Sequence, residues 1–118
     1  MTVYNKLVRD GILRKIMKNR TPLERLRRVK PMYRILSPEE FRDEALPTKL
    51  TEEVKELREA IASHDRAKIL EELADVQDVT DAIRITQCIS TTELMGEQAR
   101  KGSLNGGFLK RIFLISFG

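Results

Sequence analysis

Two short acidic runs contain the side chains best suited to do chemistry. They are Glu52-Glu53-Val54-Lys55-Glu56 and Glu71-Glu72-Leu73-Ala74-Asp75. Each run has two carboxylates three residues apart, which places them on one face of a helix. Carboxylate oxygens bind hard divalent cations and can also act as general acids or bases. The runs therefore indicate either a metal site or two solvated acidic helix faces.

Two amphipathic helices are needed to position these runs. Apolar residues recur at steps of three and four from Thr48 to Ala62, and a similar pattern extends from Lys68 to about Gln87. This is the pattern of a helix with one apolar stripe. The link between the two segments is only Ser63-His64-Asp65-Arg66. So short a link predicts that the helices are antiparallel neighbours.

The positions of the carboxylates in this hairpin predict that they converge. At roughly 100° per residue, Glu53 and Glu56 lie about 70° and 130° to one side of the first apolar stripe. By the same roughly 100° step, Glu72 and Asp75 lie about 60° and 120° to the same side of the second stripe. Glu53 and Asp75, one on each helix, also lie at equal sequence distances from His64, and so do Glu56 and Glu72. Facing antiparallel helices are related by a two-fold axis, so both pairs should meet on one side at matching heights.

Converging carboxylates repel one another and raise their own pKa values unless a cation lies between them. Oxygen ligands favour Mg²⁺ or Mn²⁺, and no loop supplying backbone carbonyls suggests a dedicated Ca²⁺ site. Glu52 points about 160° from its stripe by the roughly 100° step, so it should contact water or the ligands, or act as a base. Asp78 rotates away and is expected to be solvated. We predict a metal site of four ligands: Glu53, Glu56, Glu72 and Asp75.

Composition narrows the class of protein. A chain of 118 residues suits one domain, 1–118, and 34% charged with 41% hydrophobic residues is not a disordered composition. No stretch approaches the roughly 20 apolar residues of a membrane helix, so we expect no membrane partner. Cys88 is the only cysteine. Because it cannot form an internal disulfide, we expect a reducing, cytoplasmic location.

Positive charge is concentrated at the start of the chain. Residues 1–34 hold 11 Lys and Arg against two acidic residues, whereas residues 35–118 hold 11 against 16. Such a basic arm can bind nucleic acid, or it can supply cations to a phosphate-bearing ligand whose metal lies among the acids. No aromatic residue interrupts the cluster from Arg25 to Lys30. A base-stacking surface is therefore unsupported, and we do not expect nucleic acid as the partner.

The other segments predict further helices. A short helix is expected from Asp10 to Asn19, before a basic connector. Ser37-Pro38-Glu39-Glu40 has a Ser cap and Pro in the first helical position, which is typical of a helix start. This helix should reach about Leu46, where Pro47 either kinks it or begins a new helix.

The C-terminal part predicts one more helix and a tail. A capping box at Ser90-Thr91-Thr92-Glu93 begins the helix, which should end near Lys101 with Gly102 as its cap. Residues 33–36 and 112–115 are β-prone and allow a small strand pair. We therefore predict an all-α protein, with an antiparallel helical hairpin extended to a helical bundle and the terminal β pair as an optional addition. A hairpin of two helices has few apolar surfaces to pack against. We therefore expect a homo-oligomer, a dimer or larger.

Three blocks of this sequence resemble a known family. The spacing Glu-Glu-x-x-Glu, fifteen residues, then Glu-x-x-Asp is similar to the signature of the MazG-like all-α nucleoside triphosphate pyrophosphohydrolases. The ends, Tyr4-Asn5-Lys6-Leu7-Val8-Arg9-Asp10 and Gly106-Gly107-Phe108-Leu109-Lys110-Arg111-Ile112, resemble the short phosphoribosyl-ATP pyrophosphohydrolase-like branch of that superfamily. The resemblance spans nearly the whole chain.

The resemblance implies Mg²⁺-dependent hydrolysis of a nucleoside triphosphate, or a related nucleotide such as phosphoribosyl-ATP, to the monophosphate and pyrophosphate. Lys101, five residues before the double glycine, resembles a family lysine that approaches the substrate phosphates. Lys6 and Arg9, in the N-terminal block, are further candidates for phosphate binding. The resemblance also implies an oligomer, and it assigns the catalytic centre to five carboxylates: Glu52, Glu53, Glu56, Glu72 and Asp75.

Two departures from the family pattern leave an alternative open. Gly11 and Asn105 stand where relatives usually carry Lys and Arg. Each departure removes a positive charge near a polyphosphate site. The alternative is a catalytically weak relative that acts as a regulatory module, or as a nucleic-acid-binding module through its basic N-terminal arm.

Overall fold

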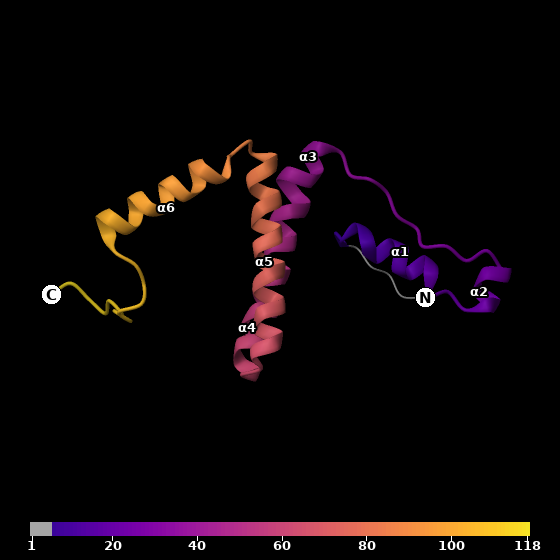
Figure 1. Ribbon diagram of the computed structural model, residues 1–118, viewed down its shortest axis with the longest axis horizontal. Helices are drawn as coiled ribbons and strands as arrows, with labels where there is room; N and C mark the ends of the chain where they lie inside the picture. Colours follow the sequence, from indigo (N-terminus) through magenta and orange to yellow (C-terminus); the bar gives the residue numbers. More distant parts are fainter. Residues whose placement is uncertain (1–5) are drawn as a thin grey trace. The chain divides into compact units, whose positions relative to one another are not determined.

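The computed structural model describes residues 6–118, which form an all-α protein with no strand among them (Figure 1). The chain divides into two compact units, the first ending at Ile83 and the second running from Arg84 to Gly118. None of the helices described is long and apolar enough to cross a membrane. The elements are α1 (Asp10–Lys18), α2 (Pro22–Leu26), α3 (Pro38–Glu40), the π-helical turn η1 (Phe41–Ala45), α4 (Leu46–Ser63), α5 (Arg66–Thr86) and α6 (Thr91–Asn105).

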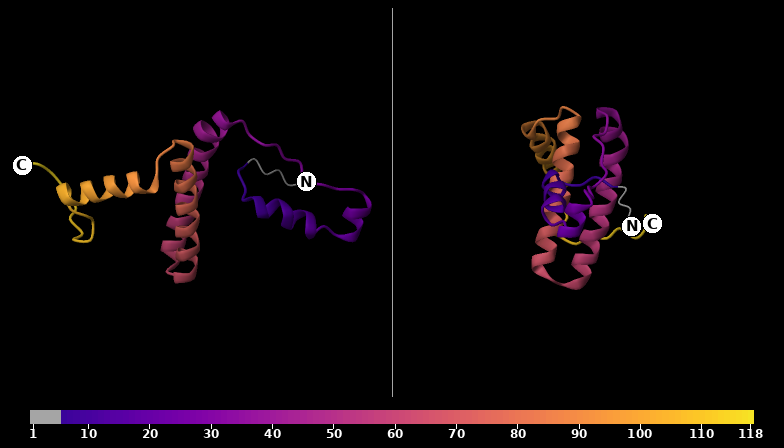
Figure 2. Two further views of the ribbon diagram at one scale, coloured as in Figure 1. Left: turned by 45° about the horizontal axis from the view of Figure 1, so that its top comes forward. Right: turned by 90° about the vertical axis from the view of Figure 1, so that its right-hand side faces the viewer.

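Helices α4 and α5 form the predicted antiparallel hairpin and lie side by side (Figures 1 and 2). His64 ends α4 in the left-handed conformation, with φ of 58°, and its N–H donates to the carbonyl of Ile61 at 3.1 Å. Asp65 Oδ1 then accepts hydrogen bonds from the N–H groups of Ala67 and Lys68, at 3.0 and 3.3 Å. This caps the start of α5, so the chain reverses with the helix ends on both sides satisfied.

The helix that leads into the hairpin contains a π-helical turn just before Pro47. Ser37 Oγ caps its start, as predicted, by accepting from the N–H of Glu40 at 3.2 Å. The N–H of Leu46 then donates to the carbonyl of Phe41, five residues back. Pro47 has no N–H, and its ring would crowd the carbonyl four residues earlier in a regular helix. The wider turn relieves this, and Pro47 lies in the first turn of a new helix, one of the two predicted alternatives.

The last helix is longer than the sequence predicted. Helix α6 begins at the predicted Ser90 cap, whose Oγ accepts from Glu93 N at 3.0 Å, but it continues through Gly102 to Asn105. Gly106, with φ of 74°, ends it. A single glycine costs a helix only about 1 kcal/mol, so Gly102 does not stop it. The positive φ at Gly106 does, because only glycine adopts such angles readily.

The basic connector and the optional β pair also differ from the sequence prediction. The basic connector contains the short helix α2, whose capping box joins Thr21 and Glu24. Residues 33–36 and 112–115 are neither strands nor helices, so the optional β pair is not formed. In both segments the large apolar side chains are exposed, with Ile35 at 85% and Ile115 at 88%. A strand needs a partner for its backbone groups, and neither segment has one.

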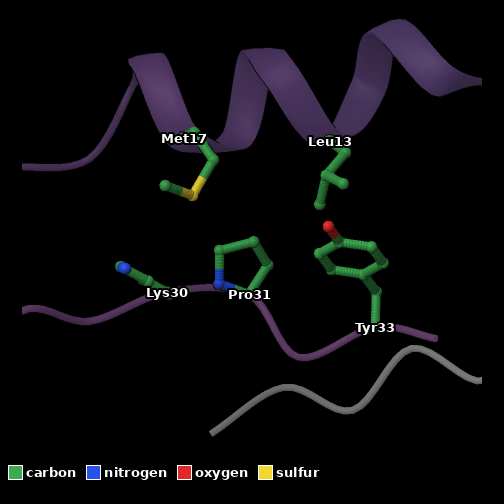
Figure 3. Close-up of a pocket in the computed structure, with 5 residues that line it drawn as sticks. All are labelled: Leu13, Met17, Lys30, Pro31 and Tyr33. Carbon is green, nitrogen blue, oxygen red and sulfur yellow. The ribbon is translucent and has the colours of Figure 1, made fainter.

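Helix α1 packs on the connector around an apolar cavity of about 270 Å³ (Figure 3). Leu13 and Met17 extend from α1 toward Pro31 and Tyr33, with Lys30 beside them. The lining contains no carboxylate and is mostly apolar. We therefore assign this cavity to the packing of the N-terminal segment.

Few apolar side chains are buried in the described part of the chain. The core residues Leu46, Ala60 and Val79 are 3%, 6% and 9% exposed. On the hairpin, by contrast, Ile61 and Leu73 are 52% and 50% exposed. The stripe that the sequence predicted as the apolar face of the hairpin is thus only partly covered.

Candidate metal centre

Four carboxylates from the two hairpin helices meet at one place. One oxygen from each lies within 4.8 Å of the others. Helix α4 contributes Glu53 and Glu56, and helix α5 contributes Glu72 and Asp75. The convergence predicted from helical periodicity and from the position of the turn is confirmed.

Two oxygen atoms of this cluster are buried without a partner. Glu53 is only 5% exposed, and its Oε2 accepts no hydrogen bond. Glu72 Oε2 is also buried and has no hydrogen-bond partner. A buried carboxylate oxygen that lacks a hydrogen-bond partner is costly, since the water that it gave up is not replaced. A hard divalent cation among these oxygens would supply the missing interaction, so the residues present fit a metal ion.

Repulsion within the cluster is visible in the pKa values of two carboxyls. Burial, followed by the negative charges of Glu56, Asp75 and Glu53, raises the pKa of Glu72 to about 7. Burial and the charge of Glu53 also raise the pKa of Glu56. Near neutral pH the metal-free cluster therefore retains protons that an ordinary surface carboxyl would have lost.

Lys49 is a counter-charge that the sequence prediction did not include. Its Nζ lies 3.2 Å from Glu53 Oε1 and 3.4 Å from Glu52 Oε2. Partial burial lowers the pKa of Lys49, but Glu53 and Glu52 raise it overall. Lys49 thus holds one oxygen of Glu53 and leaves Oε2 for another partner. Its position four residues before Glu53, the spacing of a helical ion pair, was a signal that could have identified it.

Arg9 is the second cation at the cluster. Its guanidinium lies 2.5 Å from Asp75 Oδ1 and 2.6 Å from Asp78 Oδ2, and hydrogen bonds to Asp75 and then Asp78 raise the pKa of Arg9. The expectation that Asp78 is merely solvated was wrong. No local spacing rule predicts this contact, because it depends on how the N-terminal segment approaches α5.

The remaining candidates lie outside the cluster. Glu52 is 38% exposed at its side chain and pairs with Lys49. Lys6 lines a pocket of about 280 Å³ with Glu52, Lys55, Glu56 and Glu59. Lys101 lies on α6, in the second unit. Phosphate binding by Lys6 and Lys101 stays a prediction, and Tyr4 and Asn5 of the N-terminal block lie outside the described residues.

Comparison with known proteins gives one match. Residues 41–88 match the family model of the MazG nucleotide pyrophosphohydrolase domain. No curated protein and no solved structure matches the chain. The matched segment begins at the π-helical turn and includes both hairpin helices with all four clustered carboxylates. The segment that contains the four carboxylates is therefore similar to the MazG nucleotide pyrophosphohydrolase domain, consistent with the superfamily that the sequence resembles.

Proposed function

We propose that this protein is a Mg²⁺-dependent nucleotide pyrophosphohydrolase. It would hydrolyse a nucleoside triphosphate, or a related nucleotide such as phosphoribosyl-ATP, to the monophosphate and pyrophosphate. The observation that supports this most directly is the four-carboxylate cluster, with two unpartnered buried oxygens, inside the segment that matches the MazG domain. The N-terminal and C-terminal blocks favour the short phosphoribosyl-ATP pyrophosphohydrolase-like branch.

The residues of the cluster have distinct roles in this proposal. A bound Mg²⁺ supplies positive charge that neutralises phosphate oxygens and lowers the pKa of a nearby water. Glu52, part-exposed and adjacent to the ligand Glu53, is the candidate base that accepts a proton from the attacking water. Lys6, Arg9 and Lys101 are the candidate cations that stabilise negative charge on the leaving pyrophosphate. The ion would be held by Glu53, Glu56, Glu72 and Asp75.

The proposal also specifies which bond breaks. Enzymes that release the terminal phosphate commonly hold it with a glycine-rich phosphate loop and its lysine. The sequence contains no such motif. Water would instead attack the α-phosphorus, so its oxygen ends on the monophosphate and the bond to the β-phosphate oxygen breaks.

Product analysis tests this. A panel of nucleoside triphosphates and phosphoribosyl-ATP, incubated with the protein and Mg²⁺, should give monophosphate and pyrophosphate as the primary products on chromatography. In heavy-oxygen water, mass spectrometry should find the label on the monophosphate, because water attacks the α-phosphorus. Diphosphate with inorganic phosphate as primary products would contradict the proposed bond cleavage.

We also propose that the protein works as a homo-oligomer, a dimer or larger. On the hairpin, Val54, Ile61 and Leu73 are 41%, 52% and 50% exposed. Each buried apolar side chain contributes roughly 1.5–3 kcal/mol, so covering this stripe with a second copy favours association. A helical hairpin with one uncovered apolar stripe is half of a four-helix arrangement.

Light scattering coupled to size exclusion tests the association. At micromolar concentration the purified chain should elute as a dimer or larger species. Ile61→Gln, which makes the exposed stripe polar, should shift the population toward the monomer. Lys55→Gln, an exposed polar change on the same helix, should leave the mass unchanged. A wild-type protein that is monomeric throughout would overturn this proposal.

A further inference from the structure

Arg9 bridges two carboxylates that lie on one face of α5. The two terminal nitrogens of its guanidinium go to different partners, Nη2 to Asp75 Oδ1 at 2.5 Å and Nη1 to Asp78 Oδ2 at 2.6 Å. The side chains of Arg9, Asp75 and Asp78 are 57%, 34% and 55% exposed. The N-terminal segment is thereby fixed to the hairpin through a contact that water can reach.

The two partners of Arg9 differ in what else they do. Asp75 belongs to the four-carboxylate cluster, whereas Asp78, one turn further along α5, does not. A guanidinium and a metal ion would therefore compete for the carboxylate of Asp75 but not for that of Asp78. An exposed ion pair is weak, so a cation held by four carboxylates should prevail at Asp75.

We propose that Arg9 is a latch that couples metal binding to phosphate binding. In the metal-free protein Arg9 supplies the positive charge beside Asp75. When Asp75 turns to a bound divalent cation, Arg9 gives up this contact and stays tethered beside the cluster through Asp78. Its guanidinium then presents hydrogen-bond donors to the phosphates of the nucleotide, a geometry that suits arginine better than lysine. This inference rests on the proposed function, and it makes metal binding the step that prepares the phosphate site.

The latch predicts two effects of opposite sign from one substitution. Arg9→Gln removes the competitor for Asp75, so Mg²⁺ alone should bind about threefold more tightly in calorimetry, the size expected for exposed ion pairs. The same change removes a phosphate contact, so inorganic tripolyphosphate added at saturating Mg²⁺ should bind more weakly. A purely structural arginine would not move the two affinities in opposite directions. A general loss of positive charge has the same two signs, so a control variant must measure its size.

Arg14→Gln is the matched control, because it removes the same charge from the exposed side of α1. Its Mg²⁺ affinity should rise less than that of Arg9→Gln. Hydrogen exchange gives a readout independent of affinity. Mg²⁺ should speed exchange of the amides at the start of α1 in the wild type, since the latch opens, and should leave Arg9→Gln unchanged.

The outcomes separate this inference from the proposed function. If the wild type binds no Mg²⁺, the metal centre and the latch both fail. If Mg²⁺ binds the wild type and Arg9→Gln equally well, the latch is overturned and the metal centre stands. If Arg9→Gln gains Mg²⁺ affinity without losing tripolyphosphate affinity, Arg9 does not pass to the phosphates and the proposed coupling is overturned.

Discussion

Glu53→Gln should abolish Mg²⁺ binding while the α4–α5 hairpin stays folded. Glu53 is the most buried of the clustered carboxylates, and its Oε2 has no other partner. Glutamine preserves the shape of the side chain but removes one of the four anionic ligands that we propose. Loss of a residue that merely supports a ligand costs about 10–100-fold in metal affinity, so loss of a ligand should cost at least about 100-fold.

Removing this charge should not unfold the protein. The negative charge of Glu53 contributes to the raised pKa values of Glu72 and Glu56, so its loss relieves repulsion in the metal-free state. We expect a helical circular dichroism spectrum and a melting temperature that is maintained or raised. Calorimetric Mg²⁺ titration measures the affinity. Glu59→Gln, an exposed change on the same helix, should bind Mg²⁺ as the wild type does.

A second ligand variant strengthens the test. Asp75→Asn removes an anion from the other helix and should abolish Mg²⁺ binding too, although it also breaks the contact with Arg9. The proposed metal centre would be refuted if both Glu53→Gln and Asp75→Asn kept the wild-type affinity.

Mg²⁺ binding should displace protons near neutral pH. The pKa of Glu72 is raised to about 7 in the metal-free protein, and a carboxyl must be ionised to bind a metal. Below about pH 7, the ion must therefore compete with a proton, and its affinity should fall by about tenfold per pH unit at most. Calorimetric titrations with Mg²⁺ in two buffers of different ionisation enthalpy measure how many protons are released. An affinity independent of pH between 6 and 8, with no proton release, would contradict the assignment of Glu72.

The raised pKa of Glu72 also makes the stability of the metal-free protein depend on pH. The folded-state pKa of Glu72 lies above its ordinary value of 4.5, so the folded protein binds more protons than the unfolded chain between about pH 4.5 and 7. The free energy of unfolding should therefore fall as the pH rises through this window. Above about pH 7, Glu72 no longer changes the free energy of unfolding with pH. Thermal melts of the metal-free protein check this, and Glu72→Gln should flatten the dependence.

The carboxylate cluster could be predicted from sequence because everything that assembles it is local. Helical periodicity fixes the angle of each carboxylate around its helix, and the short turn at His64 fixes their relative heights. Two numbers, 3.6 residues per turn and the length of the link, are sufficient for Glu53 and Asp75 to be placed together. In the structure, one oxygen from each of the four carboxylates lies within 4.8 Å of the others, which confirms this placement.

The cations around the centre were harder to predict. Lys49 follows a local rule, the spacing to Glu53, but that rule applies equally to many solvated pairs. Arg9 is separated from Asp75 by 66 positions, and its contact depends on the path of the whole connector. The end of α6 was missed because Gly102 and Gly106 carry the same sequence signal, and only the backbone angle of Gly106 distinguishes them.

The turn at His64 has a consequence for the order of events during synthesis. All four clustered carboxylates lie between residues 53 and 75, in two helices joined by a link that costs little entropy to close. Contacts so near in sequence form early, before distant segments pack. We therefore expect the nascent chain to acquire the proposed capacity for metal soon after residue 75 leaves the ribosome, before α6 has emerged. An ion captured at that stage would stabilise the hairpin while the chain is still growing.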